Sequence, residues 1–158
     1  MNKIPKRKKI KVEFKNGWLY VNGFVAQLFS PLEEVQDGYS GYGDTGRVIY
    51  QYGNILIKFN DSHWQQTKTE IKLWKQFSED DRKYFGRVLD WDDNGQWIAV
   101  EKEDIRQKET LSKKNQEILC YLIDKYKLND IFLHYKNNRA IRKKDGTLII
   151  YDWGLQDK

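Results

Sequence analysis

The chain has 158 residues, the size of one typical domain, and a formal net charge of +5. Hydrophobic residues make up 39% of it, which is enough for a packed core and excludes wholesale disorder. Its single cysteine, Cys120, excludes an internal disulfide and fits a reducing compartment. No stretch approaches the roughly 20 apolar residues that span a bilayer, and no apolar signal-peptide segment follows the basic start. We therefore expect a soluble, cytoplasmic protein that does not contact membranes.

Two further features limit the chemistry of the chain. The only histidines, His63 and His134, stand far apart, so no cluster of zinc-type ligands is visible. The positive charge is uneven, because residues 6–9 form the basic run Lys6-Arg7-Lys8-Lys9. This run is able to contact nucleic acid or an acidic protein surface. We favour a solvated, frayed terminus, since acids and bases are interspersed in the rest of the chain.

The first half of the chain predicts two β-hairpins. Their strands cover residues 11–14, 18–21, 47–52 and 54–59. Asn16-Gly17 and Gly53-Asn54 are the turn signals, because such dipeptides between apolar runs are typical of hairpins. The second hairpin is rich in Val, Ile and Tyr, which favour strands. A polar, glycine-bearing stretch separates the two hairpins.

The middle of the chain predicts a helix over residues 61–77, capped by Asp61 or Ser62. The residues that recur at helical spacing are Thr67, Glu70, Ile71, Trp74 and Phe77. Ser78 is placed to cap a short second helix. Residues 86–91 and 96–101 then predict a strand pair around Asp93-Asn94-Gly95.

The last third predicts a long amphipathic helix from about Ser112 to Lys127. Its buried stripe consists of Ile118, Leu119, Leu122, Ile123 and Tyr126. Residues 140–142 and 147–151 predict a closing hairpin with its turn at Asp145-Gly146.

A glycine motif lies between the two N-terminal hairpins. It has the pattern G-x-G-x-x-G-x-V, with glycines at Gly41, Gly43 and Gly46 and the valine at Val48. Glycines let the backbone approach phosphate closely. In dinucleotide-binding folds such glycines open a helix, whereas here the residues that follow favour a strand. The motif therefore predicts a phosphate-binding loop at the tip of a hairpin. The simpler alternative is a flexible loop that is merely glycine-rich.

Lys58 is the one charge inside the apolar strand 55–59. A lysine there is able to reach two phosphates of a nucleotide, and the simpler alternative is an edge-strand lysine that points outward. Glu70 is the only acidic residue between Ser62 and Phe77. An ion pair between Lys58 and Glu70 would hold the lysine toward phosphate, whereas the alternative for Glu70 is a surface carboxylate.

Asp152 follows an apolar strand and stands two residues before Gly154. A carboxylate at the end of a buried strand, with a glycine beside it, is suited to hold Mg²⁺ against phosphates. The alternative is an ordinary turn that ends the strand.

Taken in chain order, these features resemble the protein-kinase-like superfamily, from about Gly38 to the end of the chain. The resemblance implies an α+β fold, with an antiparallel N-lobe sheet and a C-helix followed by a reduced C-terminal part made of a long helix and a β-hairpin. It also implies ATP and Mg²⁺ as cofactors, bound by the glycine loop, Lys58 and Asp152. Val100 and Glu101 would lie in the hinge that faces the adenine.

The resemblance implies a single kinase-like domain over residues 1–158. Residues 1–37 would form a basic segment with a hairpin, residues 38–104 the N-lobe and residues 105–158 the reduced C-lobe. Because four residues follow Gly154, we expect no activation segment and no substrate-binding helices. Such a chain resembles a minimal member, like small phage or bacterial kinase-like proteins.

The catalytic loop of the family, H-R-D-L-x-x-x-N or D-L-H-x-x-N, should precede the last hairpin. Residues 133–137 follow the second pattern, but Phe132 occupies the position of its aspartate. Asp130 is the nearest carboxylate and would serve only in a rebuilt loop. Asn137 or Asn138, depending on the register, would help to hold Mg²⁺.

Three functional hypotheses follow. The first is a small ATP-dependent phosphotransferase whose catalytic residues are Lys58, Glu70, Asp130 and Asp152. The second is an inactive kinase-like protein, of the kind that phages encode, which binds and modulates a host protein. The third is a basic nucleic-acid-binding domain led by residues 6–9. We rank it last, because the charges do not interleave with the aromatic residues in one strand or helix.

Overall fold

The computed structural model describes residues 5–29, 47–60, 65–134 and 138–154. The chain divides into two compact units. The strand unit comprises Pro5–Lys68 and Val88–Lys102, and the helix unit comprises Met1–Ile4, Thr69–Arg87 and Glu103–Lys158. Antiparallel sheets combined with a few helices make this a mixed α+β fold, which confirms the predicted class at that level.

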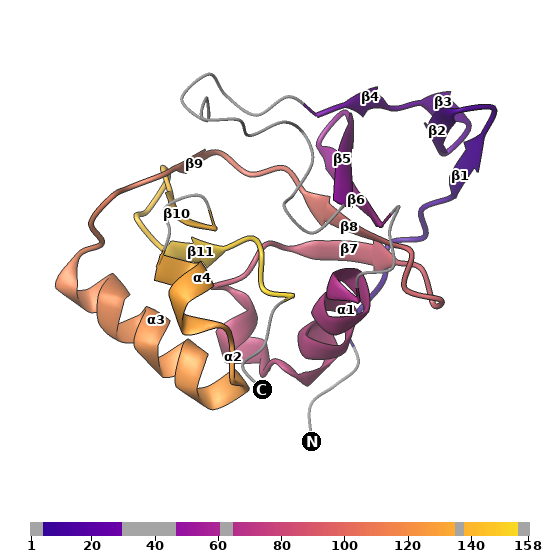
Figure 1. Cartoon of the computed structure of the whole chain (residues 1–158). Coiled ribbons are helices and arrows are strands. Elements are labelled where there is room, and N and C mark those ends of the chain that lie inside the picture. Colours follow the sequence, from indigo (N-terminus) through magenta and orange to yellow (C-terminus); the bar gives the residue numbers. More distant parts are fainter. Residues whose placement is uncertain (1–4, 30–46, 61–64, 135–137, 155–158) are drawn as a thin grey trace. The chain divides into compact units, whose positions relative to one another are not determined.

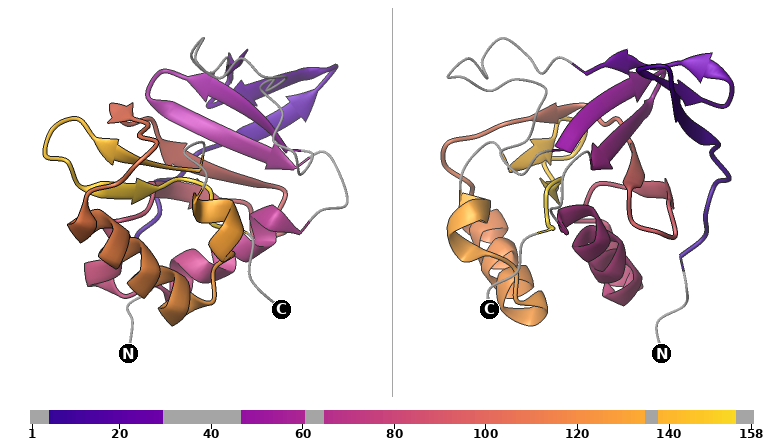
Figure 2. Two further views of the ribbon diagram at one scale, coloured as in Figure 1. Left: turned by 60° about the vertical axis from the view of Figure 1, so that its left-hand side comes forward. Right: turned by 45° about the vertical axis from the view of Figure 1, so that its right-hand side comes forward.

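The strand unit contains two antiparallel sheets (Figures 1 and 2). The larger sheet has the order β4-β5-β6-β8-β7, so β6 has a neighbour on each side, and the smaller sheet has the order β1-β2-β3. Their strands are β1 Val12–Lys15, β2 Trp18–Val21, β3 Phe24–Val25, β4 Gln27–Leu28, β5 Arg47–Tyr52, β6 Ile55–Asn60, β7 Val88–Trp91 and β8 Trp97–Glu101.

The three strand pairs predicted in this unit are confirmed. At the first turn both Asn16 and Gly17 have positive φ, 54° and 80°, which is the geometry that matches the twist of the flanking strands. Gly53 has φ 58° at the second turn. The sequence did not predict β3 and β4, because strands of two residues are too short to show alternation.

The smaller sheet packs on one face of the larger sheet. Ile57 and Phe59 of β6 belong to one apolar cluster with Leu19 and Val21 of β2. Because side chains alternate along a strand, Lys58 points to the opposite face of the larger sheet. The strand unit therefore has an apolar core on one side of β6 and the lysine on the other.

The basic run near the start is attached to the strand unit. Arg7 donates from Nε to Asp90 Oδ1 at 2.7 Å, and its guanidinium carbon lies 4.3 Å from the centre of the Trp91 ring. Asp90 is 5% exposed, and its Oδ2 accepts the backbone N–H of Ile10 at 2.9 Å. The interpretation of the run as a frayed terminus is therefore wrong for Arg7, whereas the neighbouring lysines are exposed.

The helix unit combines helices with an antiparallel sheet of order β11-β10-β9. The division between the units falls inside α1, so only its later turns belong here. Its elements are α1 Gln66–Gln76, α2 Glu79–Arg82, β9 Ile105–Arg106, α3 Lys113–Tyr126, α4 Asp130–His134, β10 Arg139–Arg142 and β11 Leu148–Ile150. α3 lies beside β11 (Figure 1).

The predicted helices are confirmed where the structure describes them. The five residues that recur at helical spacing are all buried in the structure, whereas the predicted caps, Asp61 and Ser62, lie outside the described residues. Ser78 and Ser112 cap α2 and α3 as expected. In α3 the stripe is narrower than predicted, because only Leu119 and Leu122 are fully buried. The described part of the chain contains no helix with the length and hydropathy needed to cross a membrane.

Asp81 joins α2 to α3. Its carboxylate accepts hydrogen bonds from Tyr126 Oη at 2.6 Å and Lys125 Nζ at 2.8 Å, and Tyr126 Oη in turn accepts the backbone N–H of Ser78 at 3.1 Å. Burial alone would raise the pKa of the Asp81 carboxyl. The hydrogen bonds from Lys125 and Tyr126, with a further one involving Ser78, outweigh burial and hold this pKa below its ordinary value.

We expect Asp81→Asn to destabilise the protein at pH 7 and to lose its effect in acid. Because the pKa is lowered in the folded state, the ionised carboxylate stabilises the fold fully at pH values above the ordinary Asp pKa of about 3.9. This stabilisation is lost as the pH falls through the lower pKa of the folded state. Urea unfolding of wild type and Asp81→Asn from pH 7 to pH 3 measures the difference between their free energies of unfolding.

The matched control is Asp124→Asn, because the Asp124 side chain on α3 is 91% exposed. It should change the urea midpoint little at any pH. A difference in free energy of unfolding between wild type and Asp81→Asn that stays constant with pH would contradict the role assigned to the Asp81 carboxylate.

Candidate functional site

Several predicted site residues lie outside the described part of the chain. These are Gly41, Gly43 and Gly46 of the glycine motif and Asn137 of the catalytic loop. The phosphate-binding loop therefore stays a prediction.

Lys58 lies on an interior strand. In β6 it is paired with Ile49 of β5 on one side and with Ile98 of β8 on the other. It is 6% exposed, so the interpretation as an outward-pointing edge-strand lysine is wrong. Burying an ammonium among apolar side chains is costly unless the charge is compensated, so its location requires a specific interaction.

The strand register changes the set of side chains beside Lys58. Directly paired residues of antiparallel strands share a face, and Val48 is paired with Phe59, on the apolar core side. Val48, the valine of the glycine motif, therefore lies on the face opposite Lys58, and Ile49 is the β5 residue that shares the face of Lys58. Val100 does share the face of Lys58, because it lies two residues beyond Ile98 along β8.

Glu101 ends β8, opposite Ile55 of β6. It is partly buried, and the backbone N–H of the next residue, Lys102, donates to the carbonyl of Asn54 at 2.7 Å. Val100 and Glu101 of the predicted hinge therefore belong to β8, and the strand ends at Glu101.

Glu70 is fully buried in α1, so the alternative of a surface carboxylate is wrong. Its Oε2 accepts the backbone N–H of Trp153 at 3.2 Å. The indole Nε1–H of Trp153 also donates to the backbone carbonyl of Glu70 at 3.0 Å. Two hydrogen bonds therefore fasten the Asp152-Trp153-Gly154 segment to one turn of α1.

The Trp153 ring completes this attachment. It is 1% exposed and lies among Trp74, Phe77 and Phe85, with ring centroids 6.3, 6.2 and 5.6 Å away. Because the ring and the backbone N–H are both held, the neighbouring Asp152 has a defined position at the end of β11. Asp152 itself is only partly buried. The backbone of this segment is held by more contacts than an ordinary turn at the end of a strand would need.

The predicted ion pair between Lys58 and Glu70 joins a residue of the strand unit to a residue of the helix unit. It stays a prediction. The same holds for any nucleotide contact that Lys58 and Asp152 would share.

The predicted catalytic loop contains a short helix, α4. At its ends, His134 Nε2 and Asp130 Oδ1 are 2.8 Å apart, and both side chains are exposed. Leu133, between them, is 1% exposed and anchors the helix. Asp130 is thus a hydrogen-bonded partner of His134, the histidine that the sequence placed in the D-L-H-x-x-N pattern.

Sequence reasoning missed Arg139, which organises this loop. Arg139 in β10 is 3% exposed and donates to the backbone carbonyls of Lys108 at 2.6 Å, Glu109 at 3.1 Å and His134 at 3.3 Å. Burial lowers the pKa of its guanidinium from the ordinary value. The available signal was an arginine that precedes two apolar residues at the start of a strand, but nothing in the sequence identifies its carbonyl partners.

Asn138, next to Arg139, is partly buried. Arg139 is paired with Ile150 across the β10–β11 hairpin. Asn138 and Asp152 therefore leave the hairpin at the same end, which is compatible with a shared role. Within the described ranges, no three His, Cys, Asp or Glu side chains are grouped as they would be to hold a metal unaided.

Comparison of the chain with protein-family models, with characterised proteins and with solved structures finds no match. The residues themselves are therefore the basis for a functional assignment.

We expect Glu70→Ala to destabilise the helix unit, because it leaves the buried N–H of Trp153 without its acceptor. A lost partner of this kind costs about 1–3 kcal/mol. Glu70→Gln retains an acceptor oxygen and should cost less. Urea unfolding monitored by circular dichroism gives the free energy of unfolding of each variant.

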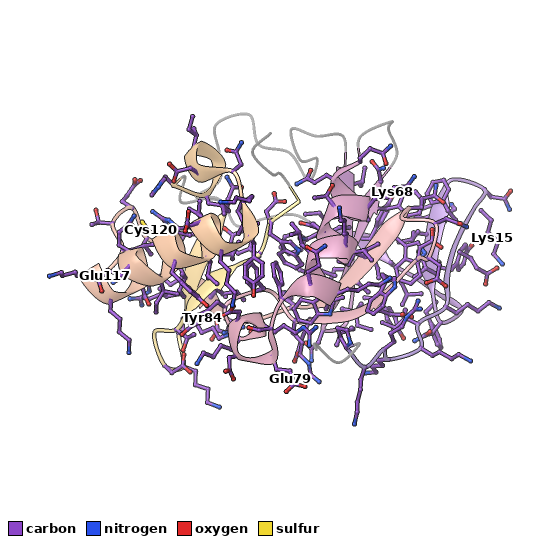
Figure 3. All side chains as sticks on the ribbon, turned by 90° about the horizontal axis from the view of Figure 1, so that it is seen from below. Lys15, Lys68, Glu79, Tyr84, Glu117 and Cys120 are labelled. Carbon is purple, nitrogen blue, oxygen red and sulfur yellow. The ribbon has the colours of Figure 1, made fainter. Side chains whose placement is uncertain are left out.

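Glu117→Ala is the matched control, because Glu117 is an exposed glutamate of α3 (Figure 3). It should stay within about 0.5 kcal/mol of wild type. Equal losses for Glu70→Ala and Glu70→Gln would show that the acceptor for Trp153 is unimportant.

Proposed function

We propose that the chain is a kinase-like protein that binds ATP with Mg²⁺. The observation that carries the proposal is the attachment of the Asp152-Trp153-Gly154 segment to the buried Glu70. A carboxylate that is to hold a metal against phosphates needs a fixed backbone, and the hydrogen bonds and ring packing of Trp153 supply one.

Lys58 is the proposed phosphate contact. It is a buried cation on the interior strand of the larger sheet, next to Ile49, Ile98 and Val100 on the same face. Apolar neighbours lower the local dielectric, so the attraction between its ammonium and a phosphate is stronger than at the protein surface. The apolar side chains would contact the base or the sugar.

Mg²⁺ fits the residues at the end of the β10–β11 hairpin. It usually binds proteins through one or two carboxylates and completes its coordination with phosphate oxygens and water. Asp152 would supply the carboxylate, and Asn138 or Asn137 an amide oxygen. The metal, when bound, would neutralise charge on the phosphates.

The reaction we propose for this site is phosphoryl transfer, in which positioning and charge neutralisation do most of the work. Asp130 would act as the proton acceptor, and its hydrogen bond to His134 provides a second group able to take up the proton. The exposure of both side chains leaves them accessible to a substrate hydroxyl.

The second candidate is a kinase-like protein that has lost catalysis and acts by binding a protein partner. The specific observation in its favour is also at Asp130. This carboxylate accepts a hydrogen bond within its own helix, and the position before Leu133 carries Phe132 in place of an aspartate.

A thermal-shift titration with ATP tests nucleotide binding. ATP with Mg²⁺ should stabilise the wild type, by about 2.7 kcal/mol at a hundredfold excess over Kd. Lys58→Ala should abolish the shift, and Asp152→Asn should abolish only the part that depends on Mg²⁺.

Lys72→Ala and Asp124→Asn are the charge-matched controls, since both residues are exposed on helices. They should leave the shift intact. No stabilisation of the wild type at millimolar ATP with Mg²⁺ would refute the proposed nucleotide site.

Transfer of the γ-phosphate of labelled ATP separates the two candidates. A phosphotransferase should label itself or lysate proteins, and Asp130→Asn should lower the rate by about 10²–10⁴-fold. If the protein binds ATP but forms no labelled product, the phosphotransferase is excluded and the non-catalytic kinase-like protein is the remaining candidate. Capture of one stoichiometric protein by both wild type and Lys58→Ala would then support partner binding that does not need nucleotide.

A further inference from the structure

The outer face of the β1–β3 sheet presents aromatic rings beside lysines. The register pairs Lys15 with Trp18, Glu13 with Tyr20 and Tyr20 with Val25, and paired residues share a face. The other face of the sheet carries Leu19 and Val21, which are buried in the core of the strand unit. The face with Trp18 and Tyr20 is therefore the one that points away from the larger sheet.

This outer face carries exposed apolar side chains beside its charged ones. Trp18 is 59% exposed and Val25 is 46% exposed. Large exposed aromatic side chains grouped on one face typically mark an interaction site. Trp18 and Tyr20 are two residues apart on one strand, so their Cα atoms are about 7 Å apart and their side chains leave the same face.

Lys15 lies next to both rings, since it is paired with Trp18. Lys15 Nζ lies 5.0 Å from the centre of the Tyr20 ring, and Lys15 extends from the margin of the sheet (Figure 3). Lys11 Nζ and Lys15 Nζ both approach the carboxylate of Glu13, at 3.2 and 3.7 Å. Glu13 is the only acid between residues 5 and 28, so the lysines outnumber it.

The charge of the chain is concentrated in this region. Residues 5–28 contain six lysines and arginines and one glutamate, a net charge of +5, which equals the formal net charge of the whole chain. The hydrogen bonds of Arg7 and of the Ile10 N–H to Asp90 fix the course of the basic run along β7. Arg7 is paired with Asp90 and Asp93, so the exposed lysines supply the remaining positive charge of this run.

We propose that the outer face of the β1–β3 sheet binds single-stranded nucleic acid. Bases would stack on Trp18 and Tyr20, and Lys11 and Lys15, which lie beside Glu13 on the same face, would contact phosphates. Aromatic platforms flanked by lysine are the usual means of binding a single strand, because every base has a flat face and every nucleotide a negative charge. An acidic protein would use the lysines but would have no equivalent need for exposed rings.

The pairing of β1 with β2 brings charged and aromatic side chains onto one face of the smaller sheet. Along the chain the basic run and the aromatic residues are separate, and the nucleic-acid hypothesis looks weak. Lys15 and Trp18 are paired across the Asn16-Gly17 turn, and Tyr20 shares their face, so one lysine and two rings lie together.

Fluorescence anisotropy with labelled dT20 and rU20 tests the proposal on the full chain. Both probes should bind, and affinity should fall as salt rises. Trp18→Ala should weaken binding about tenfold or more, whereas Trp18→Phe, which keeps a ring, should retain most of it. The double substitution Lys11→Ala, Lys15→Ala should reduce the salt slope by about 0.7 for each phosphate contact that is lost.

The matched control is Lys113→Ala with Lys114→Ala, two exposed lysines at the start of α3, which should leave the slope unchanged. Circular dichroism confirms that each variant is folded. The proposal is overturned if neither probe binds at low salt, in which case an acidic protein is the better occupant. It is also overturned if a duplex binds as tightly as a single strand, or if Trp18→Ala binds like wild type.

Discussion

The buried carboxylate of Glu70 is the constraint on which the helix unit depends. A carboxylate that is fully removed from water must accept hydrogen bonds, and a backbone N–H that is buried with it must donate one. Glu70 and Trp153 meet both needs at once. The large indole ring then fixes the distance between α1 and the end of β11, because it fills the space among Trp74, Phe77 and Phe85.

Charged side chains hold irregular backbone in both units. Arg139 binds three carbonyls of segments that have no strand partners, and Arg142 pairs with Glu103 at 2.6 Å while donating to the carbonyls of Lys83 and Phe85. In the strand unit Asp90 has the corresponding role toward Arg7 and Ile10. Because loops carry unpaired backbone groups, these contacts supply hydrogen-bond partners to loop backbone that packs against regular elements.

The regular elements were predictable because their signals are local. Asn16-Gly17 and Ser78 specify a turn and a cap through their own backbone chemistry, and the stripe of α1 repeats at the helical period. The burial of Glu70 was less predictable, since its partner Trp153 is 83 residues away in the sequence. Likewise, the orientation of Val48 depends on the register of β5 against β6. A shift of one residue moves every side chain to the other face, and composition does not specify it.

The two proposed surfaces of the strand unit lie on opposite sides of its core. Lys58 points to one face of the larger sheet, whereas the smaller sheet packs on the other face through Leu19 and Val21. Trp18 and Tyr20 lie on the far side of that smaller sheet. Since a sheet and an apolar layer separate Lys58 from the aromatic surface, a nucleotide and a nucleic-acid strand would not compete for the same side chains. Any influence of one on the other would have to pass through the packing of β2 against β6.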